Sequence, residues 1–171
     1  MIHGVVYRDG IPRRLRYREL EILIALAVTP ISLSAASLAR RCWPHLSTLQ
    51  AEAALRTTIH RLRKSLGDAA AVVHENGYRL REDVRIDLIE YEALITRLRG
   101  TELTAEDRDR LEKVFRELSV DLSELNARWR WFRPVEARLS NVCRETGALL
   151  AEDQLRRRRP YETVAANSSY K

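Results

Sequence analysis

The chain has little of the composition that marks fibrous, exported or membrane-spanning proteins. Its 171 residues include only 2 cysteines, 6 glycines and 5 prolines, which excludes collagen-like and linker-rich chains. The longest apolar run, residues 22–28, is far shorter than the roughly 20 residues that cross a bilayer. The N-terminus lacks the charged start and apolar stretch of a secretory signal. We therefore expect a cytoplasmic protein without a membrane segment.

Groups of residues that catalyse reactions or bind metals are also missing. Cys42 and Cys143 lack metal-ligand spacing, so we expect two buried thiols in a cytosolic chain. There is no glycine-rich phosphate loop, and no serine or cysteine has the pattern of a nucleophile with a histidine partner. The histidines are scattered, at positions 3, 45, 60 and 74. The acidic group at Glu106, Asp107 and Asp109 lies at a predicted helix start, where the helix dipole accounts for it. We expect no enzymatic activity, cofactor or metal ion.

The positive charge is confined to the first half of the chain. Residues 1–82 carry 13 basic and 7 acidic side chains, whereas residues 83–171 carry 17 of each. The whole net charge of +6 therefore belongs to the N-terminal half. Such an asymmetry indicates one module for a polyanion and a second, neutral module for something else.

The first half reads as alternating hairpins and helices. Asp9-Gly10 and Asn76-Gly77 lie between short β-type runs and predict two hairpins, the second over residues 71–80. Glu19 and Glu21 are acids that suit the first turn of a helix over residues 17–28, which Thr29-Pro30 ends. Ser34 is the expected N-cap of a short helix that reaches Cys42. A short strand is expected at residues 84–86.

A longer helix over residues 48–66 is the most informative element. Ser47 and Gln50 form a capping-box pattern at its start, and Gly67 suits its end. At 100° per residue, one narrow arc must be buried, and it holds Leu55, Ile59, Leu62 and Leu66. The opposite arc and its flanks are basic, and Ala53 is a small side chain among them. These positions are Gln50, Ala53, Arg56, Thr57, His60, Arg61, Arg63 and Lys64. A basic helix face is most often simply solvated, but the preceding turn at Trp43-Pro44-His45 and the following hairpin favour a DNA-reading helix.

The second half is predicted to be helical. Apolar stripes predict helices over residues 88–98, 104–118 and 134–150, and Thr104-x-x-Asp107 resembles a capping box. The arginine run 156–159 is expected to interrupt the third helix, and Pro160 to begin a fourth. Clustered aromatic residues usually serve as core or docking residues and otherwise mark a protein interface: Trp129, Trp131 and Phe132. The last segment completes no apolar face, so we expect a natural chain that continues beyond Lys171.

Four motifs together resemble the OmpR/PhoB-type winged-helix DNA-binding domain over roughly residues 3–82. They are Leu15-x-Tyr-x-Glu-x-Glu-x-Leu23, Leu38-Ala-x-x-x-Trp43, Ile59-His-Arg-Leu-Arg-Lys-x-Leu66-Gly67 and Gly77-Tyr-Arg-Leu80. A weaker likeness covers residues 83–171. There, Arg85-Ile-Asp87-Leu-x-x-Tyr91, the predicted helices and Trp129-x-Trp131 resemble the bacterial transcriptional activation domain. That domain follows the winged helix in antibiotic-regulatory-protein-type activators and consists of tetratricopeptide-like helix pairs.

The resemblance implies a set of DNA-binding residues. Arg61 would read or clamp the major groove, Trp43 would pack near the DNA backbone, and Arg79 on the wing would enter the minor groove. The other positions that it implies would line the groove or its phosphates: Thr57, Thr58, His60 and Arg63. The basic face of the helix adds Arg56 and Lys64 to the expected DNA-binding residues. Many relatives carry Arg-Thr or Arg-Ser near the start of the recognition helix, where this chain has Ala53-Ala54. That departure affects the base preference rather than DNA binding.

The expected fold is therefore α+β. A winged helix-turn-helix over residues 1–83 is followed by an all-α, tetratricopeptide-like segment over residues 84–171. The expected function is that of a sequence-specific transcriptional regulator, an activator, with double-stranded DNA and RNA polymerase as partners and a homodimer on DNA. The alternative is a protein-interaction adaptor, in which the helical half acts and the winged helix has become a docking domain.

Overall fold

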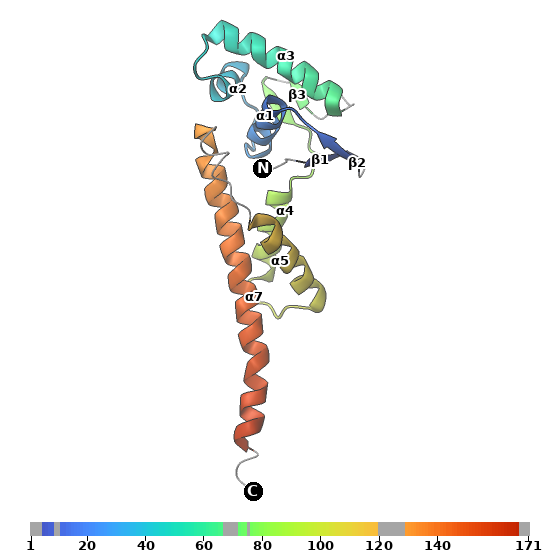
Figure 1. The fold of residues 1–171 in the computed structure, drawn as a ribbon, viewed down its shortest axis with the longest axis vertical. Coiled ribbons are helices and arrows are strands. Elements are labelled where there is room, and N and C mark those ends of the chain that lie inside the picture. Colours follow the sequence, from blue (N-terminus) through green and yellow to red (C-terminus); the bar gives the residue numbers. More distant parts are fainter. Residues whose placement is uncertain (1–4, 9–10, 67–71, 75, 120–128, 168–171) are drawn as a thin grey trace. The chain divides into compact units, whose positions relative to one another are not determined.

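The computed structural model describes residues 5–8, 11–66, 72–74, 76–119 and 129–167. The chain is α+β and mostly helical, as the sequence predicted, and it divides into two compact units (Figure 1). The first unit comprises Met1–Ile86 together with Ala127–Trp131, and the second comprises Asp87–Asn126 with Phe132–Lys171. The division differs from a single boundary after residue 83, because a short segment from the second half of the chain packs with the first unit.

The described residues of the first unit form two antiparallel strand pairs and three helices. The elements, in chain order, are β1 (Val5–Arg8), β2 (Ile11–Arg14), α1 (Tyr17–Ala27), α2 (Ala35–Cys42), α3 (Thr48–Leu66), β3 (Val72–His74) and β4 (Tyr78–Leu80). β1 pairs with β2, and β3 pairs with β4. The predicted order of hairpin, helices and hairpin is thus confirmed. The turn at Asp9-Gly10 and the helix stop at Gly67 lie outside the described residues.

Side-chain hydrogen bonds cap α2 and α3 at the N-termini that the sequence predicted. The Ser34 hydroxyl accepts a hydrogen bond from the Ser37 amide at 3.1 Å, at the start of α2. At the start of α3, the Ser47 hydroxyl accepts from the Gln50 amide at 3.4 Å, and the Gln50 side-chain oxygen accepts from the Ser47 amide at 3.3 Å. These bonds satisfy backbone amides that a helix N-terminus otherwise leaves unpaired.

Backbone hydrogen bonds join the second hairpin to the segment between α1 and α2. The Leu33 and Tyr78 backbones exchange two hydrogen bonds, with N···O distances of 2.9 and 2.7 Å, which adds a bridge beside β4. Gly77 has φ +138°, and a Cβ there would lie 2.7 Å from the Leu33 carbonyl oxygen. Only glycine fits this turn without strain.

The strand expected at residues 84–86 is absent. Val84 donates its amide to the Arg81 carbonyl at 3.1 Å, so it belongs to a turn instead of a sheet.

The core of the first unit is built around α1, α2 and α3. Ile22, Leu38, Leu55, Leu62 and Val72 are completely buried. Glu21 is also buried, with 1% of its surface exposed, and it lies beyond the first turn of α1, in which Glu19 is the acidic residue. Arg18 pairs with its carboxylate, and the Trp131 indole donates to it at 3.3 Å. Burial raises the pKa of Glu21 above the usual range of a glutamate, although Arg18 and Trp131 oppose that shift.

Residues 129–131 form what we call the tryptophan strap, which completes this core. Trp129 is 1% exposed, and its ring stacks on Trp131 at a centroid distance of 5.7 Å. Tyr17 lies against Trp129 at 5.3 Å, and the Arg41 guanidinium lies over Trp131 at 5.4 Å. The predicted core or docking role of these aromatic residues is therefore correct, with α1 and α2 as the docking site.

The described part of the second unit contains the helices α4 (Asp87–Leu98), α5 (Ala105–Leu118) and α7 (Arg133–Asn167), with a 3₁₀ turn at Arg130–Phe132 before the last. Phe132, Val135 and Val142 are among its buried residues. The prediction of a break at 156–159 was wrong, because α7 continues through it. Arg156 and Arg157 pair with Glu152 and Asp153 one turn earlier, and arginine is itself a good helix former.

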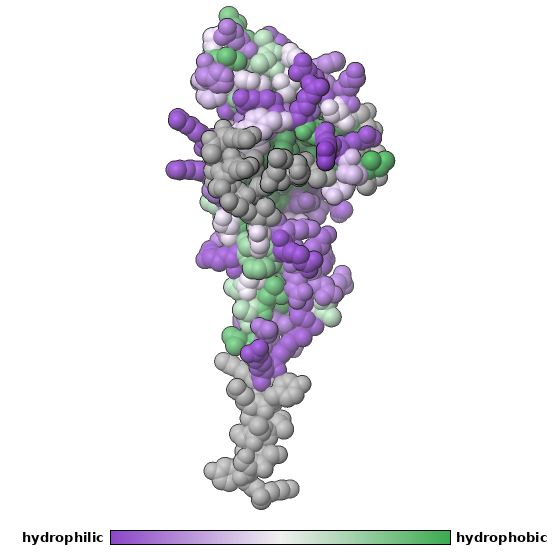
Figure 2. Space-filling view, viewed as in Figure 1, coloured by the Kyte–Doolittle hydropathy of each residue, from purple (hydrophilic) through white to green (hydrophobic). Residues whose placement is uncertain are grey.

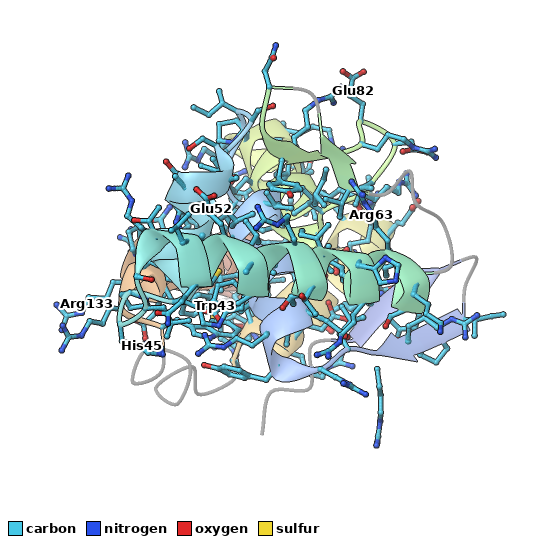
Figure 3. The ribbon with its side chains drawn as sticks, turned by 90° about the horizontal axis from the view of Figure 1, so that it is seen from above. Trp43, His45, Glu52, Arg63, Glu82 and Arg133 are labelled. Carbon is cyan, nitrogen blue, oxygen red and sulfur yellow. The ribbon has the colours of Figure 1, made fainter. Side chains whose placement is uncertain are left out.

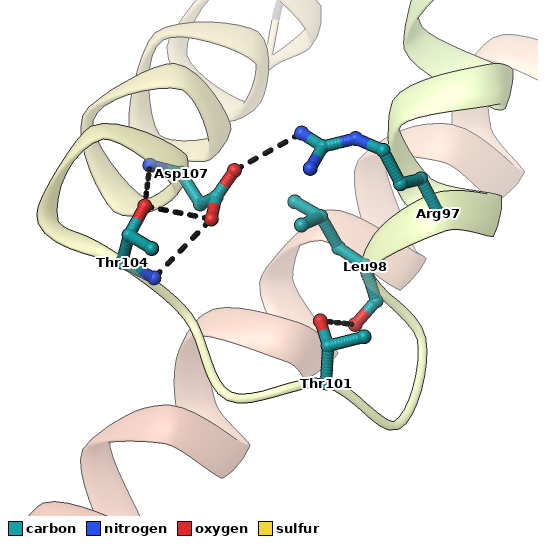
Figure 4. A network of polar contacts seen from close by, with 5 residues as sticks. All are labelled: Arg97, Leu98, Thr101, Thr104 and Asp107. Atoms are coloured by element: carbon teal, nitrogen blue, oxygen red, sulfur yellow. Dashed lines mark hydrogen bonds and ion pairs between the residues drawn. The ribbon is translucent and has the colours of Figure 1, made fainter.

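Polar contacts join the ends of α4 and α5 (Figure 4). Thr104 and Asp107 form the predicted capping box: the Thr104 hydroxyl accepts from the Asp107 amide at 3.1 Å, and the Asp107 carboxylate accepts from the Thr104 amide at 3.2 Å. Arg97, in the last turn of α4, donates to the same carboxylate at 3.0 Å. The Thr104 and Arg97 donors hold the pKa of Asp107 below its usual range.

Candidate nucleic-acid interface

The candidate interface is the solvent-exposed face of α3. The predicted buried arc is confirmed, since Leu55, Ile59, Leu62 and Leu66 are all at most 6% exposed. The other side of the helix is open to solvent along its whole length: Gln50, Ala53, Arg56, Thr57, His60, Arg61 and Lys64. Figure 2 shows hydrophilic side chains with scattered apolar ones over the part of the molecule that holds α2 and α3. The helix therefore offers one continuous accessible face.

Three cations on this face have no acidic partner among the described residues. They are Arg56, Arg61 and Lys64, and all three side chains are exposed. The ion pairs of the described chain involve other residues. Unpaired, exposed guanidinium and ammonium groups keep their full capacity to bind phosphate or base edges, since no carboxylate has to be displaced.

Two threonines that the sequence placed together on this face differ in accessibility. Thr57 is exposed, and its hydroxyl donates to the Ala53 carbonyl at 3.1 Å. Thr58 is 8% exposed, and its hydroxyl donates to the Ala54 carbonyl at 2.8 Å. The assignment of Thr58 to the DNA-facing set is thus corrected. It lies 180° around the helix wheel from Leu49, next to the core positions.

Arg63 lies at the edge of the face and holds the hairpin. Figure 3, which looks down on α3, shows Glu52 and Arg63 along the side of the helix that faces β3 and β4. An Arg63 Nη donates to the Val72 carbonyl at 2.9 Å, and its Nε is buried without a hydrogen-bond partner among the described residues. The side chain borders an open hollow of about 420 Å³ that is lined by Ala35, Glu52, Arg56, Arg63 and Tyr78. Arg63 therefore has a structural contact that the sequence did not reveal.

Trp43 and Arg79 also have protein partners. Trp43 is 8% exposed in the core, with the Arg18 guanidinium 5.4 Å from its ring centroid, so its ring packs inside the first unit. Arg79 lies on β4 with a third of its side chain exposed, and its guanidinium is 3.9 Å from the carboxylate of the fully solvated Glu82. A contact of that length with an exposed acid contributes little stability.

One exposed residue of α3 was missed by the sequence analysis. Leu49 is 81% exposed at the start of the helix, the largest exposed fraction among the large apolar residues of the described chain. Its place on the helical wheel was a usable signal, because position 49 lies 120° from Leu55 and outside the buried arc.

The described residues contain no group of three or more histidine, cysteine, aspartate or glutamate side chains that could hold a metal ion. Both cysteines are free thiols, but only Cys42 is buried, whereas Cys143 is half-buried. Burial raises the pKa of Cys42 to about 12, so this thiol stays protonated. None of the helices in the described part is both long and apolar enough to cross a membrane.

Comparison with known proteins yields no match, whether with protein-family models, with curated proteins or with solved structures. The function therefore has to be inferred from the residues of this chain.

Proposed function

We propose that the chain is a sequence-specific, double-stranded-DNA-binding regulator of transcription. The observation that carries the proposal is the exposed face of α3, on which Arg56, Arg61 and Lys64 lie without an acidic partner among the described residues. A helix with its apolar arc buried and its cationic arc free fits the major groove of B-DNA, which admits one α-helix.

The neighbouring elements support a winged helix-turn-helix over residues 1–83. α2 precedes α3 with only a short turn between Cys42 and Thr48, which is the connection that a helix-turn-helix needs. The β3–β4 hairpin follows α3 and carries Arg79. In the proposed complex α3 enters the major groove, and the hairpin reaches the adjacent minor groove with Arg79. Arg61 reads a base, while Arg56 and Lys64 contact phosphates.

The second unit is the proposed activation segment. Its described part contains α4, α5 and α7, as expected for a segment that resembles tetratricopeptide-like helix pairs, and several of its basic side chains pair with acids of the same unit. We propose that it acts on RNA polymerase after the first unit has bound DNA, and that the chain binds DNA as a homodimer.

The proposal is tested by selecting bound duplexes from a random pool, sequencing them, and then measuring the affinity for the recovered duplex against salt. We expect a defined sequence motif and a log–log salt slope of about −0.9 for each phosphate contacted. Half-sites about one helical turn apart in the same orientation would indicate head-to-tail dimers.

Two results would contradict the proposal. A random pool with steep salt dependence would reduce the basic face to non-specific electrostatic binding. An affinity that is negligible at low salt would favour the adaptor alternative, in which the helical segment does the binding.

A further inference from the structure

The exposed face of α3 begins with apolar side chains, and its cations follow from Arg56 onwards. Leu49 is 81% exposed, and Ala53 and Thr57 are exposed as well. A single exposed leucine is common on protein surfaces and requires no explanation. Here, however, three carbon-rich side chains follow one another at intervals of four residues on the helix that the proposed function assigns to the major groove.

These three side chains share the solvent face of the helix. With 3.6 residues per turn, positions 49, 53 and 57 fall within an arc of about 80°, on the side opposite the buried leucines. Ala53 lies near the middle of the exposed face, so the helix backbone is thinly covered there. The Thr57 hydroxyl is already used, since it donates to the Ala53 carbonyl at 3.1 Å. The methyl group is therefore the part of Thr57 that is left for an outside contact.

Gln50 and Glu52, which precede Arg56 in this helix, have other contacts or surroundings. The Gln50 side-chain oxygen accepts from both the amide and the hydroxyl of Ser47, at 3.3 and 3.0 Å, and so belongs to the helix cap. Glu52 is half-buried and borders the hollow on the hairpin side. No cation is present before Arg56 in this helix.

We propose that Leu49, Ala53 and Thr57 read the 5-methyl groups of thymines in the major groove, so that the preferred duplex contains thymines under the first three turns of α3. The inference rests on the proposed function and specifies its substrate. Thymine carries the methyl group that distinguishes an A·T pair in the major groove, and alanine and the threonine methyl are among its known apolar partners. In helix-turn-helix complexes, moreover, the N-terminal residues of the second helix approach the bases.

Charge selects DNA over a protein as the occupant of this face. His60 falls within the same arc as Leu49 and Ala53, and Arg56 and Lys64 lie on the same open side of the helix. An apolar protein partner would have to desolvate Arg56 and Lys64, whereas DNA offers phosphates to these two cations and thymine methyl groups to Leu49.

The experiment uses the full chain and the duplex recovered by the random selection. Each thymine in the recognised sequence is replaced in turn by deoxyuridine, which removes the 5-methyl group and leaves the base pairing intact. Affinity is measured at fixed salt for the wild type, for Leu49→Ala, for Ala53→Gly and for Leu155→Ala. Leu155 is a matched control, because it is an exposed leucine on α7, 62% exposed, outside the proposed interface.

We expect one or more deoxyuridine positions to weaken the wild-type complex about fourfold each, the factor that corresponds to the burial of one methyl group at about 0.8 kcal/mol. Leu49→Ala should weaken binding to the thymine duplex by a similar or larger factor. At one of those positions it should also abolish the effect of deoxyuridine, while Leu155→Ala changes neither quantity. Leu49 is exposed, so thermal unfolding of both variants should match that of the wild type.

Failure of this inference is distinguishable from failure of the proposed function. A sequence-selective, salt-dependent complex that ignores every thymine-to-deoxyuridine change overturns the methyl readout alone. The same conclusion follows if two results occur together. Deoxyuridine weakens binding equally for the wild type and for Leu49→Ala at all positions, and it weakens binding by the same factor for Ala53→Gly. A pool without any recovered motif overturns sequence-specific binding, and the methyl readout with it.

Discussion

The exposed face of α3 and the surface of the second unit arrange charge differently. In the second unit, several basic side chains have acidic partners: Arg97 with Asp107 at 3.0 Å, Arg138 with Glu92 at 2.7 Å, and Arg108 and Arg157 with Asp153 at 3.6 and 3.1 Å. On α3, Arg56, Arg61 and Lys64 have none among the described residues, and they share one open helix face. Paired charges on a surface contribute solubility and a little stability, whereas unpaired charges of one sign attract a polyanion. A cluster of unpaired cations on one helix face thus suits a polyanion better than a surface of mixed, partly paired charges does.

The largest expected effect is that of removing the buried Trp129 side chain. Trp129 follows α5 in the chain but packs with the first unit, where it is 1% exposed. Trp129→Ala should lower the free energy of unfolding of the first unit by about 3–5 kcal/mol, the range for deletion of a large buried aromatic side chain. Chemical denaturation followed by circular dichroism measures the change. An unfolding transition that does not move would show that the tryptophan strap is dispensable for the first unit.

The next effect separates an unpaired arginine from a paired one. Arg61→Ala should weaken binding to the selected duplex by about 1–3 kcal/mol, the range for one good base contact, and leave stability unchanged. Arg138→Ala is the matched control, since it removes an arginine that pairs with Glu92. It should leave DNA affinity unchanged and cost less than about 1 kcal/mol of stability. Equal affinities for Arg61→Ala and wild type in a direct titration would disprove the base-reading role.

Lys64 tests whether an unpaired cation contacts phosphate instead of a base. Lys64→Ala should weaken binding to all duplex sequences alike and reduce the salt slope by about one. Affinities for the selected and for a scrambled duplex, each at several salt concentrations, measure both quantities. A loss confined to the selected duplex would assign Lys64 to base recognition.

The smallest effects concern two carboxylates whose pKa values are shifted in opposite directions. The pKa of Asp107 is lowered by its bonds to Thr104 and Arg97, so this group stabilises the second unit above the ordinary aspartate pKa of about 3.9. That stabilisation is lost as the pH falls through the lowered value. Asp107→Asn should remove this acid dependence from the thermal unfolding of α4 and α5. A dependence that persists in the variant would exclude Asp107 as its source.

Glu21 should show the reverse dependence in the first unit. Burial raises its pKa, so the folded state holds the proton more tightly than the unfolded state does. The contribution to stability is therefore present below the ordinary glutamate pKa of about 4.3 and is lost as the pH rises through the raised value. Thermal unfolding of Glu21→Gln, compared with wild type across that window, should lack this decline. Parallel curves for the two proteins would contradict the assignment.

Local rules were sufficient for the element that matters most. The bounds of α3, its capping box and its buried arc follow from the Ser47–Gln50 spacing and the leucine periodicity, and all three are confirmed. Local rules missed a contact that a distant part of the chain supplies. The buried Glu21 carboxylate accepts a hydrogen bond from the Trp131 indole, 110 residues away in sequence, and no local pattern contains that bond. The strand expected at residues 84–86 failed for a local reason instead, since the Val84 amide donates to the Arg81 carbonyl in a turn.

The candidate site shows the same division between local pattern and packing. Hydrophobic periodicity separates the two sides of α3, because apolar area must leave water whichever element covers it. It assigns Arg61 and Lys64 to the open side without any knowledge of the fold. Packing alone decides the positions at the edge of the arc, where Thr58 turns inward and Arg63 binds the Val72 carbonyl. The pairing of charges is likewise a tertiary property, because an ion pair forms only between side chains that the folded chain brings within reach.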